Sequence, residues 1–292
     1  MGFSRATVVE SVVLNPRLRR IRLDVPDLPD LALPNQPDEV VGMYFPVDGQ
    51  VSPPDMECRD GVWGYYDVDP MPEGRNYTVR AIEPDSTVMT VDFVVHDHGI
   101  ATTWAQRAQV GDEVAMAHGR GWYCPEPTTD WQLLVADLAG LPALARIIDE
   151  LPTGVRATAI VEVVDESDLH YLPTHDGVEL ITLVGSGNGY GDSRLDGAVE
   201  QFEHPEGRGY CWFAAEAKAS RAVRKHLRRQ YGWKADQCDI IGYWRFDGEL
   251  WARKFEAEGA EALAVYSQAL AEGKSPKVAA EEYDDALESV GL

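Results

Sequence analysis

Residues 75–80 have the sequence RNYTVR and predict one short strand among several. Side chains alternate across a strand, so Arg75 and Tyr77 share one face while Thr78 and Arg80 share the other. An aromatic ring beside a guanidinium provides a planar surface and a fixed cation, which suits a flavin that carries a pyrophosphate. An ordinary polar edge strand would show the same pattern, so this segment alone leaves both interpretations open.

Further strand patterns lie on both sides of this segment. Stretches rich in Val and Thr, or alternating in polarity, occur at 6–13, 18–25, 40–47, 76–82, 87–95 and 113–117, and turn signals separate them. Residues 48–74 contain a Pro-Pro pair, several glycines and many acids, which predict a long surface loop or a hairpin insertion. One helix is expected at about 102–108. Five or six short strands with so little helix predict a closed antiparallel β-barrel.

A different pattern begins at Trp131. Apolar stretches at 132–136, 157–164, 178–184, 210–215 and 239–243 predict strands, and residues 141–150 and 221–230 predict helices between them. This alternation indicates an α/β domain with a parallel sheet. Beyond about Phe246 the chain becomes rich in Ala and Glu, and we expect helices with Gly259 and Gly273 between them. The expected organisation is a barrel at 1–128, an α/β domain at 129–246 and an acidic helical extension at 247–292.

Composition excludes several classes of protein. The 292 residues carry a formal net charge of -23, which disfavours nucleic acid and anionic lipid surfaces as partners. No apolar run reaches the roughly 18 residues of a membrane span, and the N-terminus lacks a signal-peptide pattern. The four cysteines include no CxxC pair and no histidine at zinc-finger spacing, so we expect reduced thiols and no metal site. A cytoplasmic protein without membrane insertion is expected.

A second candidate segment runs from Asp92 to residue 105. A strand passes through Val94 and ends at His96, Gly99 makes a turn, and a helix begins near Thr102. The N-terminus of a helix presents unpaired N–H groups and a positive dipole end, which together attract anions. Simple capping of the helix by a threonine explains the same pattern.

Two other segments have weaker signals. The loop at 137–143 lies between a buried strand and a helix, where α/β sheets bind ligands, but a plain connection is as good an explanation. Residues 184–191 are rich in glycine yet fail the GxGxxG pattern at every register, which favours a loop.

The only dense basic run lies at 218–229, mostly on the helix expected at 221–230. Its cations are Lys218, Arg221, Arg224, Lys225, Arg228 and Arg229. On a helix, Arg221, Arg224, Lys225 and Arg228 fall on one stripe, and the apolar residues lie on another face. A solvated face that balances the acids is one interpretation. A cradle for an anionic substrate or a nucleotide phosphate is the other.

Together these segments resemble the siderophore-interacting protein family, the ferric-siderophore reductases of the ferredoxin-reductase superfamily. The pattern Arg75-x-Tyr77-Thr78-x-Arg80 matches the family's flavin motif, and residues 92–105 match its pyrophosphate segment. Residues 111–121 look like the end of its flavin barrel, while 143–152 and 212–245 are similar to its C-terminal domain. The resemblance covers about residues 5–245. Residues 136–143 (ADLAGLPA) depart from the family's usual GDETALPA, so the flavin half matches better than the pyridine-nucleotide half.

The resemblance implies FAD on the barrel, and NADH or NADPH as electron donor on the α/β domain. It implies that Tyr77 packs on the flavin, that Thr78 hydrogen-bonds near its reactive nitrogen and that Arg75 meets the pyrophosphate. Tyr77 and Thr78 are thus the candidate catalytic residues, and backbone N–H groups of residues 101–103 are expected to bind the phosphates. The candidate cofactor-binding residues are Arg75, Tyr77, Thr78, Val79, Asp92, Val94, His96, Gly99, Ala101, Thr102, Thr103, Trp104 and Asp137.

The implied reaction is reduction of a ferric siderophore, with release of ferrous iron in the cytoplasm. On charge alone, Arg224, Arg228, Lys234 and Arg245 are candidates for steering this anionic chelate. Two alternatives stay open: a general NAD(P)H:flavin or diaphorase-type reductase, and a non-enzymatic flavin- or siderophore-binding protein. We expect a monomer or a weak homodimer.

Overall fold

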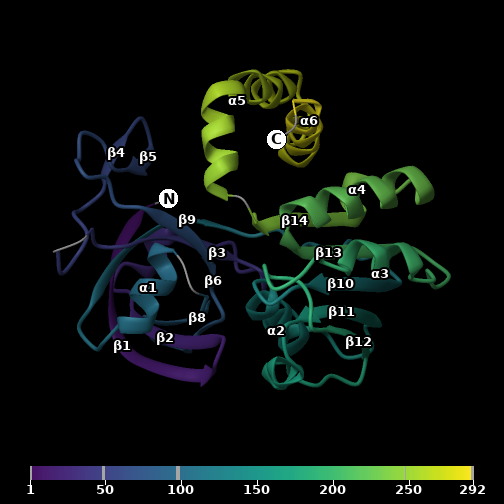
Figure 1. Ribbon diagram of the computed structural model, residues 1–292, viewed down its shortest axis with the longest axis horizontal. Coiled ribbons are helices and arrows are strands. Elements are labelled where there is room, and N and C mark those ends of the chain that lie inside the picture. Colours follow the sequence, from purple (N-terminus) through teal and green to yellow (C-terminus); the bar gives the residue numbers. More distant parts are fainter. Residues whose placement is uncertain (1, 48–49, 97–98, 247, 291–292) are drawn as a thin grey trace. The chain divides into compact units, whose positions relative to one another are not determined.

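The computed structural model describes residues 2–47, 50–96, 99–246 and 248–290, which divide into two compact units (Figure 1). The first unit contains the chain up to Cys124 together with residues 138–156 and 165–179. The second contains residues 125–137, residues 157–164 and the chain from Leu180 onward. Two short segments from the C-terminal half of the sequence therefore group with the N-terminal unit.

A seven-stranded antiparallel sheet forms the first unit. Its order is β6-β3-β9-β1-β2-β8-β7. The strands are β1 (Phe3–Asn15), β2 (Leu18–Asp24), β3 (Val40–Tyr44), β6 (Gly74–Thr78), β7 (Ala81–Ile82), β8 (Val88–Val94) and β9 (Glu113–Arg120). Alternate residues such as Ala6, Val8, Ile21 and Leu23 are fully buried, because period-two patterning turns one face of each strand inward. The predicted antiparallel, barrel-like domain is confirmed.

The strand expected at 76–82 is two strands in the structure. β6 ends at Thr78, where the chain changes its hydrogen-bonding partner. The N–H of Val79 donates to the carbonyl of Glu39 (2.9 Å), whereas the N–H of Arg80 donates to the carbonyl of Thr90 (2.9 Å). β6 therefore pairs with β3, and β7 pairs with β8.

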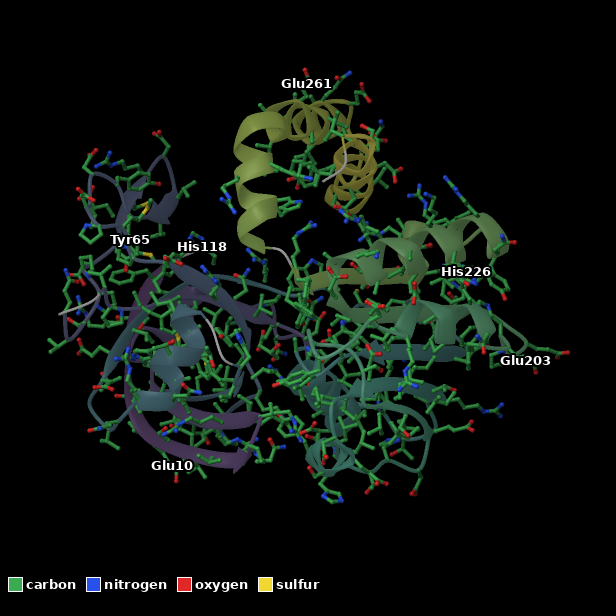
Figure 2. All side chains as sticks on the ribbon, in the orientation of Figure 1. Glu10, Tyr65, His118, Glu203, His226 and Glu261 are labelled. Carbon is green, nitrogen blue, oxygen red and sulfur yellow. The ribbon has the colours of Figure 1, made fainter. Side chains whose placement is uncertain are left out.

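The insertion at 48–74 contains the expected hairpin, formed by β4 (Glu57–Arg59) and β5 (Val62–Gly64). Asp60 and Gly61 both have positive φ, which suits a tight two-residue hairpin turn. Trp63 and Tyr65 pack with Phe3 in a small apolar cluster on the outer face of the sheet (Tyr65 is labelled in Figure 2). Residues 48–49 lie outside the described residues.

Within the described residues, four helical segments complete the first unit, of which the first is a short 3-10 segment at Leu28–Leu31. The helix α1 (Ile100–Arg107) confirms the expected one and buries Ala101, Trp104 and Ala105 in the main core. The helix α2 (Leu141–Glu150) has Pro142 in its first turn, where a missing N–H costs nothing. A short 3-10 segment, Glu166–Tyr171, was not expected from the sequence.

The second unit has a five-stranded sheet in the order β12-β11-β10-β13-β14. The strands are β10 (Trp131–Ala136), β11 (Ala157–Val163), β12 (Val178–Val184), β13 (Gly209–Glu216) and β14 (Cys238–Trp244). β10 is parallel to β11 and β13, and β13 is parallel to β14, so the predicted parallel sheet is confirmed. Every residue of β10 is buried, as its continuous apolar sequence predicts. The helix α4 (Ala217–Tyr231) matches the expected basic helix, whereas α3 (Leu195–Gln201) was not predicted.

The acidic C-terminal region forms two helices, α5 (Gly248–Ala271) and α6 (Pro276–Ser289). Gly273 has a φ of +80° and lies in the turn between them, as expected. The expectation that Gly259 also separates two helices is wrong, because Gly259 lies inside α5. A Cβ at Gly259 would lie 2.4 Å from the ring of Phe255, so close packing explains this glycine better than a turn. Within the described residues, no helix is long and apolar enough to cross a membrane.

Candidate functional site

The ring of Tyr77 forms an aromatic wall at β6. It is half-buried, and its centroid lies 4.2 Å from that of Phe93 and 6.5 Å from that of Phe45. Phe93 and Phe45 in turn contact Trp104 of α1, so the four rings belong to one cluster. Burial raises the pKa of the Tyr77 hydroxyl, although Arg75 opposes this shift. The ring therefore stays neutral at physiological pH and keeps a fixed orientation, as a stacking surface requires.

Arg75 lies on the same strand and has an exchangeable partner. Its side chain is 53% exposed, and its guanidinium contacts the carboxylate of Glu73 (2.9 Å) and the carbonyl of Gly74 (2.8 Å). An exposed ion pair contributes only about 0–1 kcal/mol, so an arriving phosphate can replace Glu73 at small cost. Arg75 and Tyr77, two positions apart on β6, are an exposed cation and a half-buried ring.

A buried arginine of α2, Arg146, binds the backbone just after Tyr77. Thr78 and Val79 are buried, and the carbonyl of Val79 accepts a hydrogen bond from the guanidinium of Arg146 (2.8 Å). Arg146 also binds the carboxylates of Glu39 (2.9 Å) and Glu150 (2.6 Å), and its own side chain is 9% exposed. The sequence did not indicate this clamp, because Arg146 and Glu39 are 107 residues apart.

Asp92 of β8 is buried in a polar network. Its carboxylate accepts two hydrogen bonds from Arg20 (2.8 and 2.7 Å) and one from the hydroxyl of Tyr171. The hydrogen bond to Asp92 raises the pKa of Arg20, and burial raises that of Tyr171. The sequence singled out Asp92 as a candidate cofactor residue but did not indicate Arg20 or Tyr171 as its partners. Val94, the last residue of β8, is half-buried.

The side chain of Thr102 joins the start of α1 to the backbone at the end of β8. Its hydroxyl accepts from the N–H of His96 (3.1 Å) and donates to the carbonyl of His96 (3.2 Å). Gly99 begins α1 with a φ of 112°, a value that favours glycine. The N–H of Thr103 donates to the carbonyl of Gly99 (3.1 Å), so it is not available to a phosphate, contrary to the expectation from the sequence. The N–H groups of residues 100–102 precede this first helical bond. His96 is exposed at this end of the helix, and residues 97–98 lie outside the described residues.

These features fit a flavin that carries a pyrophosphate. They combine a neutral aromatic wall, an arginine with a replaceable partner, and a helix N-terminus that begins at glycine. The Nε of Arg80 is buried and has no hydrogen-bond partner among the described residues, which leaves an orphaned donor just beyond β6. A terminal nitrogen (Nη2) of the same guanidinium donates to the carboxylate of Asp149 of α2 (2.6 Å).

The loop after β10 contains Asp137, which is 1% exposed. Its carboxylate accepts a hydrogen bond from the indole N–H of Trp244 at the end of β14 (2.5 Å). The glycine-rich segment at 185–191 is a loop, with positive φ at Gly185, Gly187 and Gly189. The buried carboxylate of Glu162, which the sequence did not single out, supports this loop by accepting from Ser186.

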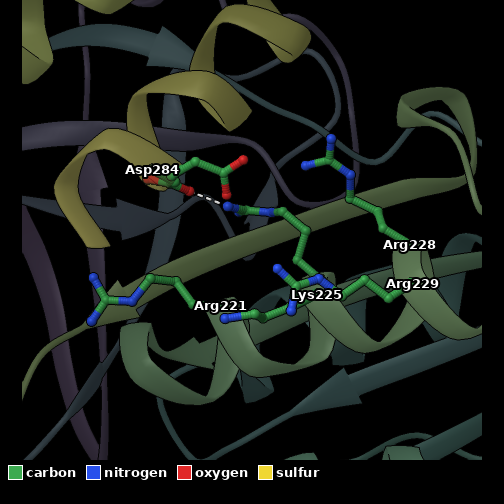
Figure 3. A pocket seen from close by; sticks show the side chains of 7 residues that line it. Arg221, Lys225, Arg228, Arg229 and Asp284 are labelled. Carbon is green, nitrogen blue, oxygen red and sulfur yellow. Dashed lines mark hydrogen bonds and ion pairs between the residues drawn. The ribbon is translucent and has the colours of Figure 1, made fainter. Parts of the chain in front are cut away.

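The four predicted substrate cations do not form one group. Arg224 and Arg228 line the same cavity, of about 230 Å³, along α4 (Figure 3). Lys234 is exposed beyond the end of α4, and the guanidinium of Arg245 lies 4.2 Å from the ring centroid of Trp251. Neither Lys234 nor Arg245 lines that cavity. Among the described residues, no group of three His, Cys, Asp or Glu side chains could hold a metal ion.

Comparisons with known proteins define the class. Residues 7–123 match the family described as siderophore-interacting FAD-binding domain, and residues 129–247 match the family described as siderophore-interacting protein. With its ferredoxin-reductase-like two-domain fold, the chain is of the class of flavoprotein oxidoreductases with FAD as cofactor.

Individual relatives place it within this class. A protein from Escherichia coli named NADPH-dependent ferric-chelate reductase is 30% identical over 71% of this chain and 79% of its own. A Vibrio cholerae protein named ferric vibriobactin reductase is 28% identical over 81% of this chain and 87% of its own. The solved structure of a siderophore utilization protein from T. fusca has a TM-score of 0.73 and 31% identity, covering 84% of this chain and 93% of that one. The chain belongs to the siderophore-interacting protein family.

Proposed function

We propose that this chain is a cytoplasmic ferric-siderophore reductase that takes electrons from NADH or NADPH, passes them through FAD to iron(III), and releases iron(II). The observation that carries the proposal is the pairing of Tyr77 and Arg75 on β6 in a family whose relatives are named as ferric-chelate reductases. When bound, FAD supplies the conversion of one hydride into two single electrons. Oxygen-rich chelators hold hard Fe³⁺ better than Fe²⁺, so reduction loosens the complex.

The side chains of the first unit bind and orient the cofactor. Tyr77 gives the flavin ring a flat surface, and Arg75 exchanges Glu73 for a phosphate. The hydroxyl of Thr78 hydrogen-bonds to the flavin ring near its reactive nitrogen. The N–H groups of Ala101 and Thr102 bind the pyrophosphate at the positive end of α1.

The other predicted cofactor residues support these contacts. Asp92 holds Arg20 and Tyr171 in place, and Thr102 fixes the course of the chain between His96 and α1. Gly99 lets the backbone approach the phosphates closely, because no Cβ intervenes. The same two segments, β6 to Val79 and β8 to α1, also contain the predicted cofactor residues Val79, Val94, Thr103 and Trp104. We assign Asp137, which follows β10, to binding of the nicotinamide nucleotide.

The substrate in this proposal is an anionic ferric chelate. Arg224 and Arg228 in the cavity of α4, together with Lys234 and Arg245, supply the positive charge that attracts it. We expect the protein to act as a monomer or a weak homodimer.

A steady-state substrate panel separates the proposal from its alternatives. Purified protein is loaded with FAD and assayed with NADH and NADPH against ferric siderophores, free flavin and quinones. The proposal predicts the highest kcat/KM with a ferric siderophore. Faster turnover of free flavin or quinone would establish a diaphorase-type reductase instead. A protein that binds ferric siderophore but gains no flavin absorbance on adding FAD would be a binding protein without this activity.

A further inference from the structure

The helix α4 has an unusual concentration of positive charge. It contains six Lys and Arg residues and no Asp or Glu, within a chain whose net charge is -23. Its apolar residues Val223 and Leu227 are buried, so the cations are left on the opposite stripe. A basic concave surface of this kind focuses field lines and attracts anions.

The cavity along this stripe is lined by cations from one helix and acids from another. Among the described residues its lining consists of Arg221, Arg224, Lys225, Arg228 and Arg229 of α4 with Asp284 and Asp285 of α6. Figure 3 shows Asp284 facing the cationic side chains, and the ion pair that it forms with Arg224 is drawn as a dashed line. The second guanidinium nitrogen of Arg224 donates to the carbonyl of Ile240 (2.6 Å), which fixes the orientation of the group.

The helical pair α5–α6 complements α4 in charge. Residues 248–289 carry ten Asp and Glu and four Lys and Arg, a net charge of -6, against +6 for α4. The pair also has an apolar core of its own, in which Ala262 and Leu287 pack with Trp251, Phe255, Tyr283 and Ala286. Its core therefore does not depend on burying apolar side chains against α4.

Polar contacts attach the helical pair to the rest of the second unit. Besides the pair between Arg224 and Asp284, Lys277 of α6 binds the carboxylate of Asp239 (2.8 Å), and Arg245 packs over Trp251. The side chains of Arg224 and Asp284 are 15% and 29% exposed, so salt weakens this pair and another anion can replace the carboxylate of Asp284. The carboxylate of Asp239 is buried, so its pair with Lys277 holds the start of α6 more firmly. An interface of apolar side chains has no carboxylate that an anionic ligand could replace.

We propose that the stripe of α4 is a binding groove for a compact polyanion, and that Asp284 and Asp285 occupy it in cis as a gate. Guanidinium groups bind phosphate and carboxylate through paired hydrogen bonds, so a ligand with several such groups competes with two carboxylates for the same cations. Binding displaces Asp284 and Asp285 from the groove, while the contacts between α5 and α6 persist. This inference rests on the proposed role of Arg224 and Arg228 in binding anions, but not on electron transfer.

The test is a calorimetric titration of the full chain with inorganic pyrophosphate and, separately, with citrate, without FAD or NAD(P)H. The variant D284N/D285N removes both gate charges. The control E261Q/E272Q removes two charges from exposed positions on the helical pair that do not line the cavity, and Figure 2 labels Glu261 on α5. We expect D284N/D285N to bind pyrophosphate about ten-fold more tightly than the wild type, a change of about 1.4 kcal/mol, and the control to bind as the wild type does.

The groove is tested by adding Arg224→Ala and Arg228→Ala to D284N/D285N, which should abolish the gain. Equal affinity of D284N/D285N and wild type overturns the gate, and so does an equal gain in E261Q/E272Q, which would reflect net charge alone. A gain in D284N/D285N that is larger for citrate than for pyrophosphate supports the gate and assigns the groove to polycarboxylates. Because no cofactor is present, failure here leaves the reductase proposal standing, and success does not depend on it.

Hydrogen exchange provides a second readout that needs no variant. Saturating pyrophosphate should speed exchange of the amides of α6 around Asp284 in the wild type and leave the buried strand β10 unchanged. Unchanged exchange in α6 at saturation contradicts displacement.

Discussion

At the scale of single residues, the candidate flavin site depends on side chains with opposite degrees of burial. Tyr77 is held by neighbouring rings, whereas Arg75 is exposed and shares its charge with Glu73. A packed ring and an exposed cation suit a ligand whose ring must be oriented and whose phosphates arrive from solvent.

We expect Arg75→Ala to weaken FAD binding by about 10- to 100-fold, because a hydrogen bond to a charged group contributes about 1.5–3 kcal/mol. Quenching of FAD fluorescence on titration with protein measures the affinity. Arg59→Ala is the matched control, since Arg59 is similarly exposed and paired with Glu57 and Asp67. Wild-type affinity in Arg75→Ala would remove Arg75 from the phosphate site.

We expect Arg146→Ala to lower the free energy of unfolding by about 3–5 kcal/mol, because it leaves Glu39 as a buried, uncompensated charge. Urea unfolding followed by circular dichroism measures the change. Arg208→Ala, which removes a more exposed pair with Asp236, should cost less than about 1 kcal/mol. Equal losses in the two variants would contradict the buried clamp.

The individual partners of site residues could not be predicted from the sequence. Arg75 and Tyr77 are neighbours on one strand, so their relation follows from strand periodicity alone. Asp92 meets Arg20 from 72 residues away and Tyr171 from 79 residues away. Contacts of that kind depend on which strands pair and where a distant turn lies, and no local pattern encodes them.

At the scale of elements, continuous apolar runs and helix signals predicted most strands and the helices α1, α2 and α4. The elements that were missed have weak local signals. The helix α3 contains Gly197 and only seven residues, and the change of partner at Val79 depends on Glu39 and Thr90. Gly259 was taken for a helix boundary, although the space beside Phe255 explains it.

The segment after α3 predicts a dependence of stability on pH. The ring of His204 stacks on Tyr231 (3.8 Å between centroids) and lies near Trp131 and Trp233. Burial, assisted by His226, lowers the pKa of His204 below its usual value of 6.5. The unfolded chain therefore binds a proton before the folded chain does, so this contribution to stability is complete above pH 6.5 and declines as the pH falls below it.

We expect His204→Phe to keep the stacked ring and to flatten the fall in unfolding free energy on the acid side of neutrality. Urea unfolding at a series of pH values measures it. An unchanged slope in His204→Phe would show that His204 does not titrate on folding.

At the scale of the whole molecule, two units carry the two halves of the proposed chemistry. The change from short β-strands to strand–helix alternation near Trp131 predicted this division. The sequence could not show that residues 138–156 and 165–179 group with the first unit, because that grouping rests on contacts such as those of Arg146, Arg80 and Tyr171. Nor could it show that an acidic helix meets the basic stripe of α4.

An anaerobic titration tests the central claim most directly. Protein loaded with FAD is reduced with one equivalent of NADH or NADPH, and a ferric siderophore is then added with a ferrous-specific chelator. The account predicts that the flavin absorbance bleaches, that it returns on adding the siderophore, and that two ferrous ions form for each nucleotide oxidised, because one hydride carries two electrons. A flavin that neither nucleotide bleaches, or that stays bleached in the presence of ferric siderophore, would contradict the assignment.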